Sequence, residues 1–222
     1  VDPAELQRID AAEAQSLREA PREDFEEASS IWAHGLRGRT AALWIVWFCV
    51  NLSYYGAFIW IPSLLVADGF TLVKSFQFTL IITLAQLPGY AMAAWLIETW
   101  GRRPTLATFL LGSAASALFF GTASTETTII LAGCLLSFFN LGAWGALYAI
   151  GPELYPSHIR GAGTGSAAGF GRIASIIAPL IVPPILLWGD SIALFSLFSA
   201  AFVLAAVATL TLPEQRGKVL DA

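Results

Sequence analysis

Residues 162–188 read AGTGSAAGFGRIASIIAPLIVPPILLW, and this stretch indicates whether the chain folds in water or in a lipid bilayer. Its only charged residue is Arg172. A helix of about 20 mostly apolar residues crosses the hydrocarbon core of a bilayer, which is about 30 Å thick. The stretch therefore predicts a transmembrane helix that carries one arginine in its interior.

The composition of the whole chain also indicates that it folds in a lipid bilayer. Of its 222 residues, 56% are hydrophobic and 13% are charged, and the mean hydropathy is +0.67. Soluble domains are about 45–50% apolar and about 25% charged. Six apolar runs are long enough to span a bilayer. They predict an all-α membrane protein with six transmembrane helices at about 42–66, 76–97, 104–123, 127–150, 162–188 and 191–212.

Charge divides the chain into three expected regions. Residues 1–30 contain nine acidic and three basic residues, a net charge of −6, whereas residues 31–222 contain seven acidic and nine basic residues, a net charge of +2. We expect a polar cytoplasmic linker or helix at 1–40, the membrane domain at 41–213 and a cytoplasmic tail at 214–222. We also expect the chain to be part of a longer protein, because it begins with Val1 and no signal peptide precedes the first apolar run.

Lysine and arginine residues are distributed unequally between the expected loops. Cytoplasmic loops of membrane proteins carry the excess of these residues. The side of the membrane opposite the termini has only Lys74. We therefore expect both termini to be cytoplasmic, in a plasma membrane or bacterial inner membrane. The basic residues on the side of the termini are Arg37, Arg39, Arg102, Arg103, Arg160, Arg216 and Lys218.

The six expected helices form two groups of three with a faint internal repeat. Each group begins with a helix that carries asparagine or polar and aromatic residues, and ends with an uncharged helix rich in small residues, at 104–123 and 191–212. We expect these two uncharged helices to take outer, packing positions. Three-helix repeats of this kind are typical of secondary transporters.

Polar and aromatic residues recur on one face of four expected helices. Between 76 and 97, for example, Thr79, Thr83, Gln86 and Tyr90 follow each other at helical spacing. A single polar residue can simply hydrogen-bond a neighbouring helix, but four such faces favour a shared wet cavity whose aromatic lining suits a ring-bearing solute. The predicted substrate-binding residues are Asn51, Tyr55, Gln86, Tyr90, Asn140, Trp144, Tyr148 and Arg172.

Arg172 lies too deep in its helix to reach the headgroups easily. Eleven residues separate it from Gly161, which places it about 16 Å inward at about 1.5 Å per residue. An ionised group at that depth costs at least about 2.5–3.5 kcal/mol, and arginine does not shed its proton. Three interpretations remain open: Arg172 binds an anionic solute, pairs with an acid in another part of the protein, or donates to backbone carbonyls.

Metal-binding, cofactor-dependent and enzymatic functions are not indicated. Cys49 and Cys134 lie in separate apolar runs, and neither His34 nor His158 has a ligand partner at metal spacing. No nucleophile–base pair is visible. We therefore expect no cofactor, no metal, no nucleic-acid partner and no enzymatic activity.

Two loop motifs resemble those of the major facilitator superfamily. Glu98-Thr99-Trp100-Gly101-Arg102-Arg103-Pro104 is similar to the loop between the eighth and ninth helices of that family, although Thr99 stands where the family usually has a base. Residues 152–161, PELYPSHIRG, resemble the signature that follows the tenth helix in sugar porters and in organic-ion and niacin-type relatives. The resemblance covers about residues 31–218.

This resemblance implies that the chain is the C-terminal six-helix half of a twelve-helix carrier, whose partners are the bilayer and an N-terminal half. Residues 51–56, NLSYYG, lack the glutamine pair of sugar porters, and the run 86–90, QLPGY, looks like niacin or aromatic-acid carriers. The implied function is proton-coupled transport of a small organic acid such as nicotinate. The implied cytoplasmic gate or latch comprises Glu98, Gly101, Arg102, Arg103, Glu153 and Arg160.

Two other functions stay open at this point. The chain could belong to a transporter of a sugar or other neutral metabolite, with Arg172 paired to an acid of the other half. It could also belong to a membrane sensor or scaffold that binds a solute without moving it.

Overall fold

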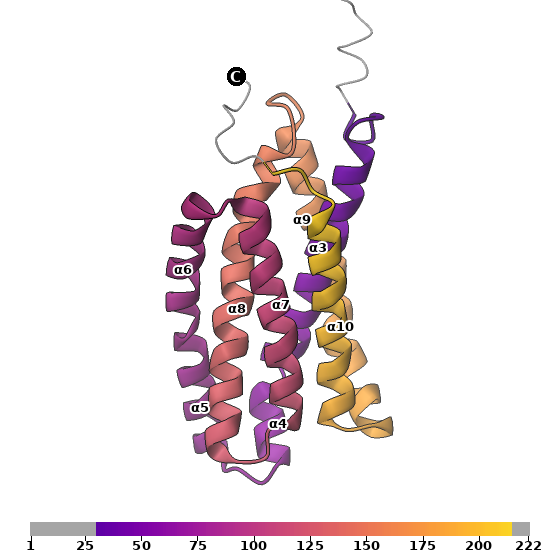
Figure 1. The fold of residues 1–222 in the computed structure, drawn as a ribbon. Helices are drawn as coiled ribbons and strands as arrows, with labels where there is room; N and C mark the ends of the chain where they lie inside the picture. The colour runs from indigo at the N-terminus through magenta and orange to yellow at the C-terminus, as the bar shows by residue number, and fades with distance from the viewer. Residues whose placement is uncertain (1–29, 215–222) are drawn as a thin grey trace, which may run out of the picture.

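A computed structural model describes residues 30–214, and all regular elements in this range are α-helices. Figure 1 shows them as a bundle of roughly parallel and antiparallel rods. Their bounds are α3 (Arg37–Phe58), α4 (Ile61–Ala67), α5 (Leu72–Leu84), α6 (Gln86–Thr99), α7 (Arg102–Thr122), α8 (Glu126–Glu153), α9 (Arg160–Trp188) and α10 (Ser191–Leu210). Residues 1–29 and 215–222, which include much of the expected linker and tail, lie outside the described residues.

Six spans are long and apolar enough to cross a membrane, in agreement with the predicted number. They correspond to α3, to α5 with α6, and to α7, α8, α9 and α10. The beginning of α3 and the end of α10 lie at the same end of the bundle, together with the α6–α7 and α8–α9 connections (Figure 1). The chain is therefore an integral membrane protein whose described ends share one side.

The first predicted span, 42–66, is not one continuous helix. α3 ends at Phe58, and the short helix α4 begins at Ile61 with Pro62 in its first turn. Proline has no backbone N–H, and its ring clashes with the carbonyl of the residue four positions earlier, which here is Phe58. Helix α3 therefore stops before Pro62, and α4 starts where proline is tolerated.

The second span contains a similar break at Ala85, between α5 and α6. Pro88 is the third residue of α6, so the carbonyl of Leu84 cannot receive its usual helical bond. The span predicted at 76–97 is therefore made of two helices joined at Ala85.

The transmembrane helices pack in a row in which α8, α7, α10 and α3 follow one another, with α6 on α8 at one end and α9 on α3 at the other. The helices that contain the two predicted uncharged spans, α7 and α10, pack against each other, and the hydroxyl of Ser199 donates to the carbonyl of Ala114 at 2.9 Å. α5, α6 and α9 are the least buried, with only 28% and 22% of the two spans buried. Two of the helices with polar stripes, α6 and α9, therefore lie at the exposed ends of the row, and the other two, α3 and α8, are their inner neighbours.

Glycines allow the close approach of α8 to α7. A Cβ atom at Gly142 would overlap the ring of Phe109, and one at Gly112 would overlap the ring of Phe139. Gly112 thus makes room for an aromatic side chain of α8. These aromatic contacts hold α7 and α8 together in an apolar core in the middle of the row.

We predict that Gly142→Ala destabilises the protein by about 1–3 kcal/mol, because the added methyl group overpacks the core against Phe109. Gly169→Ala is the matched control, since a Cβ atom there meets nothing within 4 Å. The measurement is chemical unfolding of the full-length protein in detergent. Equal stability of the two variants would show that α7 and α8 do not pack as closely as described.

Candidate functional site

Arg172 lies in the middle of α9 with an exposed side chain. Its Nη1 donates a hydrogen bond to the hydroxyl of Tyr55 on α3 at 2.9 Å. The ion pairs of residues 30–214 do not include Arg172. Because a guanidinium has five N–H donors, most of its donors are available for a partner outside the described residues.

Five aromatic rings extend from Tyr55 across to α8. Tyr55 contacts Tyr54 with ring centroids 5.2 Å apart, and Tyr54 lies 6.0 Å from Trp144. Trp144 stacks on Tyr148 at 5.6 Å, and Trp47 contacts both of these rings edge to face, at 5.5 Å and 5.1 Å. The structure therefore connects Arg172 to three of the predicted ring contacts, of which Trp144 is buried, with 6% exposed, and Tyr148 is open.

Helix α6 contributes two further predicted residues to this surface. The side chain of Gln86 lies near the phenol of Tyr54. The ring of Tyr90 packs at Gly145, where an added Cβ atom would lie 3.2 Å from it. Tyr90 and Tyr148 are 42% and 56% exposed, so both rings can still contact a solute.

The two asparagines are buried and do not share this open surface. Asn51 is 1% exposed, donates its amide to the carbonyl of Trp47 at 2.8 Å, and faces the backbone of α9 at Gly171. Asn140 is fully buried, and its amide nitrogen and oxygen have no partner among the described residues. A role of either residue in solute binding stays a prediction.

A cluster of ion pairs lies at the end of the bundle that holds both described termini. Arg102, at the start of α7, pairs with Glu153 at the end of α8 with 3.0 Å between Nε and Oε1. It also approaches Glu98 of α6 at 3.7 Å. The side chains of Arg102 and Glu153 are 20% and 14% exposed, whereas Glu98 is 74% exposed. Exposed pairs contribute at most about 1 kcal/mol, so the pair with Glu153 is the stronger one.

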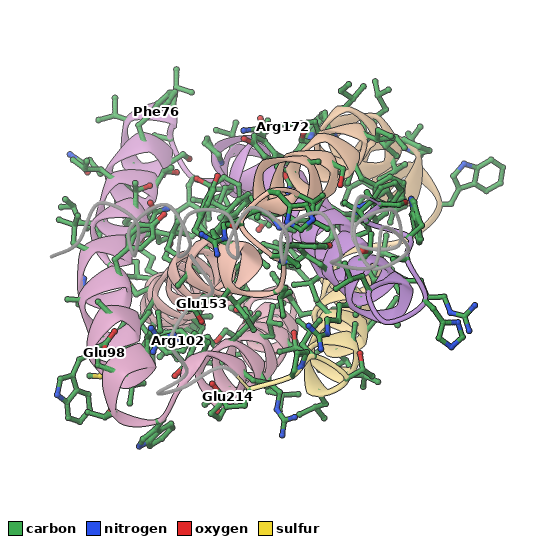
Figure 2. The ribbon with its side chains drawn as sticks, turned by 90° about the horizontal axis from the view of Figure 1, so that it is seen from above. Phe76, Glu98, Arg102, Glu153, Arg172 and Glu214 are labelled. Atoms are coloured by element: carbon green, nitrogen blue, oxygen red, sulfur yellow. The ribbon has the colours of Figure 1, made fainter. Side chains whose placement is uncertain are left out.

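These ion pairs join α6, α7 and α8 of the same chain. They involve three of the predicted latch residues. Figure 2 shows Glu98, Arg102 and Glu153 side by side, seen from this end. The second carboxylate oxygen of Glu153 and the Nε atom of Arg160 are buried without a partner in residues 30–214.

Glu214 accepts hydrogen bonds from the first backbone N–H groups of α7. Its carboxylate accepts the backbone N–H groups of Arg102 and Arg103 at 3.2 Å and 3.0 Å, and Arg103 in turn donates to the carbonyl of Leu212 at 3.2 Å. Gly101 has φ of 106°, and a Cβ atom there would lie 2.9 Å from the carboxylate carbon. Glycine is therefore needed at 101 both for its backbone conformation and for the approach of Glu214.

Tyr155 of the second loop motif holds α3 against the α8–α9 connection. Its hydroxyl lies 3.0 Å from that of Thr40, which donates to the carbonyl of Ile31, and its ring packs on Gly163. Burial raises the pKa of the Tyr155 phenol above its usual value. The phenol therefore stays neutral at ordinary pH and keeps this contact.

Comparison with known proteins places this geometry in a family. A family model described as "Sugar (and other) transporter" matches residues 4–222. The chain belongs to this transporter family, within the major facilitator superfamily. The crystal structure of FucP, a major facilitator superfamily transporter in the outward conformation, matches with a TM-score of 0.63 over 77% of this chain and 41% of that chain. At 17% identity this likeness shows the fold.

Two curated relatives are much closer in sequence. A Bacillus subtilis protein, provisionally named a niacin/nicotinamide transporter, is 47% identical over 207 residues, which are 93% of this chain and 52% of the relative. The niacin transporter of Acinetobacter baylyi is 47% identical over 194 residues, which are 86% of this chain and 44% of the relative. The chain thus spans about half the length of the curated relatives it matches.

Three residues of this transporter chain were missed by sequence reasoning. Trp47 and Tyr54 lie on the same face of α3 as Asn51, at i−4 and i+3, so the helical periodicity that selected Asn51 could have selected them too. The sequence contains only a weak indication of the role of Glu214. Helix α7 starts after Gly101 without a capping side chain of its own, so the first N–H groups of α7 need an acceptor from another part of the chain. The predicted tail at 214–222 therefore begins with a residue anchored on the bundle.

We predict that Glu214→Ala lowers the free energy of unfolding by about 0.5–2 kcal/mol, because it leaves the first N–H groups of α7 without a cap. Glu98→Ala is the matched control, since it removes a largely exposed carboxylate near the same arginine. The measurement is thermal unfolding of the full-length transporter in detergent. An effect of Glu214→Ala no larger than that of Glu98→Ala would contradict the capping role.

Proposed function

We propose that the chain is the C-terminal six-helix half of a twelve-helix secondary transporter that carries a small aromatic carboxylate, with nicotinate as the first candidate. Membership of the transporter family supports transport, and the half-length match to its relatives supports a missing N-terminal half. The names of both relatives include niacin. The solute itself is argued from the chemistry of Arg172.

The exposed, unpaired guanidinium of Arg172 is the observation that carries the proposal. A charge inside a membrane-spanning helix must face water, protein or an anion. Among the described residues its bonded partner is the neutral hydroxyl of Tyr55. The planar donor fork of arginine matches the two oxygens of a carboxylate. An organic acid therefore supplies the missing charge.

The rings beside Arg172 suit the remainder of such a solute. Tyr55 is bonded to the guanidinium, Tyr90 and Tyr148 are exposed nearby, and the buried Trp144 stacks beneath Tyr148. Aromatic pairs contribute about 0.5–1.5 kcal/mol each beyond the area they bury. A flat ring attached to a carboxylate can therefore bind Arg172 and an aromatic face at the same time.

Transport requires the solute to reach each side of the membrane in turn. We propose alternating access between this half and an N-terminal half, in a plasma or bacterial inner membrane with both termini cytoplasmic. The ion pairs around Arg102 would then hold the ends of α6, α7 and α8 together on the cytoplasmic side, where the two halves meet when that side is closed. Transport is coupled to protons, and the coupling group lies in the other half.

A sugar or other neutral solute is the second candidate, because the matching family is described by sugar transport. In that case Arg172 would pair with an acid of the other half instead of the solute. A sensor or scaffold that binds a solute without moving it is the third. The three functions differ in whether organic-acid uptake occurs and in whether it depends on Arg172.

We predict that the intact carrier takes up labelled nicotinate or benzoate and that Arg172→Ala reduces this uptake about 10- to 100-fold, as expected for a lost charge-assisted hydrogen bond of about 1.5–3 kcal/mol. Arg37→Ala, which removes an exposed arginine at the start of α3, is the matched control. Uptake is measured in membranes with equal amounts of each variant, with and without a proton gradient. A labelled hexose serves as the competing solute.

Each outcome separates the candidates. Normal organic-acid uptake by Arg172→Ala would contradict its role as the anion anchor. Hexose uptake without organic-acid uptake would favour the neutral-solute transporter. Binding of the acid without uptake would favour a sensor.

We predict that Glu153→Gln slows uptake at least about 5-fold while solute affinity stays within about 2-fold, because the variant weakens the cytoplasmic cluster without touching the Arg172 surface. Glu98→Gln, which alters the exposed and longer pair, is the control. Uptake rate and equilibrium binding are measured on the same preparations. A parallel loss of affinity, or an equal effect of Glu98→Gln, would contradict a gating role.

A further inference from the structure

A pocket lies at the end of the bundle that holds the described termini, where α3 and α7 begin and α10 ends (Figure 1). Its volume is about 440 Å³, within the range of about 300–1,000 Å³ for pockets that bind small ligands. Its lining includes Gly35, Gly38, Arg39, Arg103 and Thr211. The pocket therefore shares no residue with the proposed solute site.

Two arginines give this pocket its charge. Arg39 donates an N–H to the carbonyl of Leu154 at 3.5 Å, and Arg103 donates one to the carbonyl of Leu212 at 3.2 Å. Both arginines are partly exposed, and the ion pairs of residues 30–214 include neither of them. Because each guanidinium has five N–H donors, most of these donors remain for a ligand in the pocket.

The described lining of the pocket contains no acid that neutralises these arginines. The nearby carboxylate of Glu214 accepts the backbone N–H groups of Arg102 and Arg103 at 3.2 Å and 3.0 Å. It therefore caps α7 and does not line the pocket. Arginine pairs well with phosphate, whose oxygens match its planar set of donors. The charge of the pocket thus favours a phosphate-bearing anion.

The beginning of α3 leaves room for such a group. A Cβ atom at Gly35 or at Gly38 would meet nothing within 4 Å. The space beside Arg39 is therefore a property of the backbone and is not produced by the position of one long side chain.

An apolar stripe on α10 leads to the pocket. Thr211 follows Val207 by four residues and Leu204 by seven, so the three residues lie on one face of the helix. The span of α10 has the highest mean hydropathy of the six, 2.3, which suits contact with acyl chains. The stripe comprises four side chains that are between 42% and 58% exposed, those of Val203, Leu204, Val207 and Leu210.

We infer that this pocket binds the headgroup of an anionic phospholipid, with the phosphate between Arg39 and Arg103 and an acyl chain along the stripe of α10. Basic pockets between transmembrane helices on the cytoplasmic side bind anionic headgroups, and the pocket lies on this side in the proposed orientation. A soluble phosphate or an acidic peptide has the matching charge but makes no use of the apolar stripe. The bound lipid connects the ends of α3, α7 and α10.

The test is binding of phosphatidylglycerol to the purified full-length protein in detergent, measured by native mass spectrometry over a lipid titration. The wild-type protein is expected to bind one equivalent at least about 10-fold more tightly than it binds phosphatidylcholine with the same acyl chains. Arg39→Gln is expected to weaken the binding of phosphatidylglycerol at least about 10-fold, because it removes a charge-assisted hydrogen bond. It is expected to leave phosphatidylcholine binding unchanged.

Two further variants separate charge from misfolding. Arg37→Gln is the matched control, because it removes an exposed arginine from the same turn of α3 outside the pocket. It is expected to keep the affinity for phosphatidylglycerol within about 2-fold of the wild-type value. Arg39→Lys keeps the positive charge and is expected to stay within about 3-fold.

Four outcomes would overturn the lipid site. The first is an equal affinity of the wild-type protein for the two lipids, and the second is an equal effect of Arg39→Gln and either Arg37→Gln or Arg39→Lys. The third is binding of glycerol 3-phosphate as tight as that of phosphatidylglycerol, which would assign the pocket to a soluble phosphate. The fourth is lipid binding that requires Glu26→Gln and Glu27→Gln together, which would assign the pocket to the acidic segment before α3.

The proposed transport function does not depend on these results, because the lipid pocket and the solute site have no residue in common. Loss of the lipid site would leave nicotinate uptake and its dependence on Arg172 to be decided by the uptake measurement.

Discussion

The structure depends on one constraint: an arginine that cannot lose its proton lies inside a membrane-spanning helix. Burying that charge among apolar side chains would be prohibitive, so α9 cannot occupy the middle of the bundle. It packs on α3 at one end of the helix row, with Arg172 exposed and bonded to Tyr55. The same arrangement places the charge next to a surface of aromatic rings. The feature that is costly for folding is thus the one that can bind an anion.

The rest of the row supplies a rigid support for this surface. α7 and α10 carry no charge in their apolar spans and pack against each other and against α8 and α3. Glycines 112 and 142 admit aromatic rings at helix contacts where a Cβ atom would overlap them. Because lipid tails are as apolar as these side chains, close packing is the main force that holds such helices together. The apolar core therefore fixes the rings of α3 and α8 relative to each other.

At the end of the bundle that holds the described termini, polar contacts connect the helices. Glu214 caps α7, and Arg102 connects that helix to Glu153 of α8 (Figure 2). Tyr155 connects the next loop to α3. These bonds couple α7, α8, α3 and the segment after α10 in one cluster. A displacement of any of these elements therefore also moves the Arg102–Glu153 pair.

The sequence by itself determined the membrane-spanning class, the number of spans, the isolation of Arg172 and the family resemblance of the two loops. These depend on local runs of apolar residues, on charge counts and on short motifs. Only the tertiary structure decided that Asn51 and Asn140 are buried, and that Trp47, Tyr54 and Glu214 join the functional clusters. Helical periodicity predicts on which face of its helix a residue lies, but it does not predict which residue of another helix that residue contacts. Those contacts form between segments far apart in the chain. Glu214 is the clearest case, because its partners precede it by 111 and 112 residues.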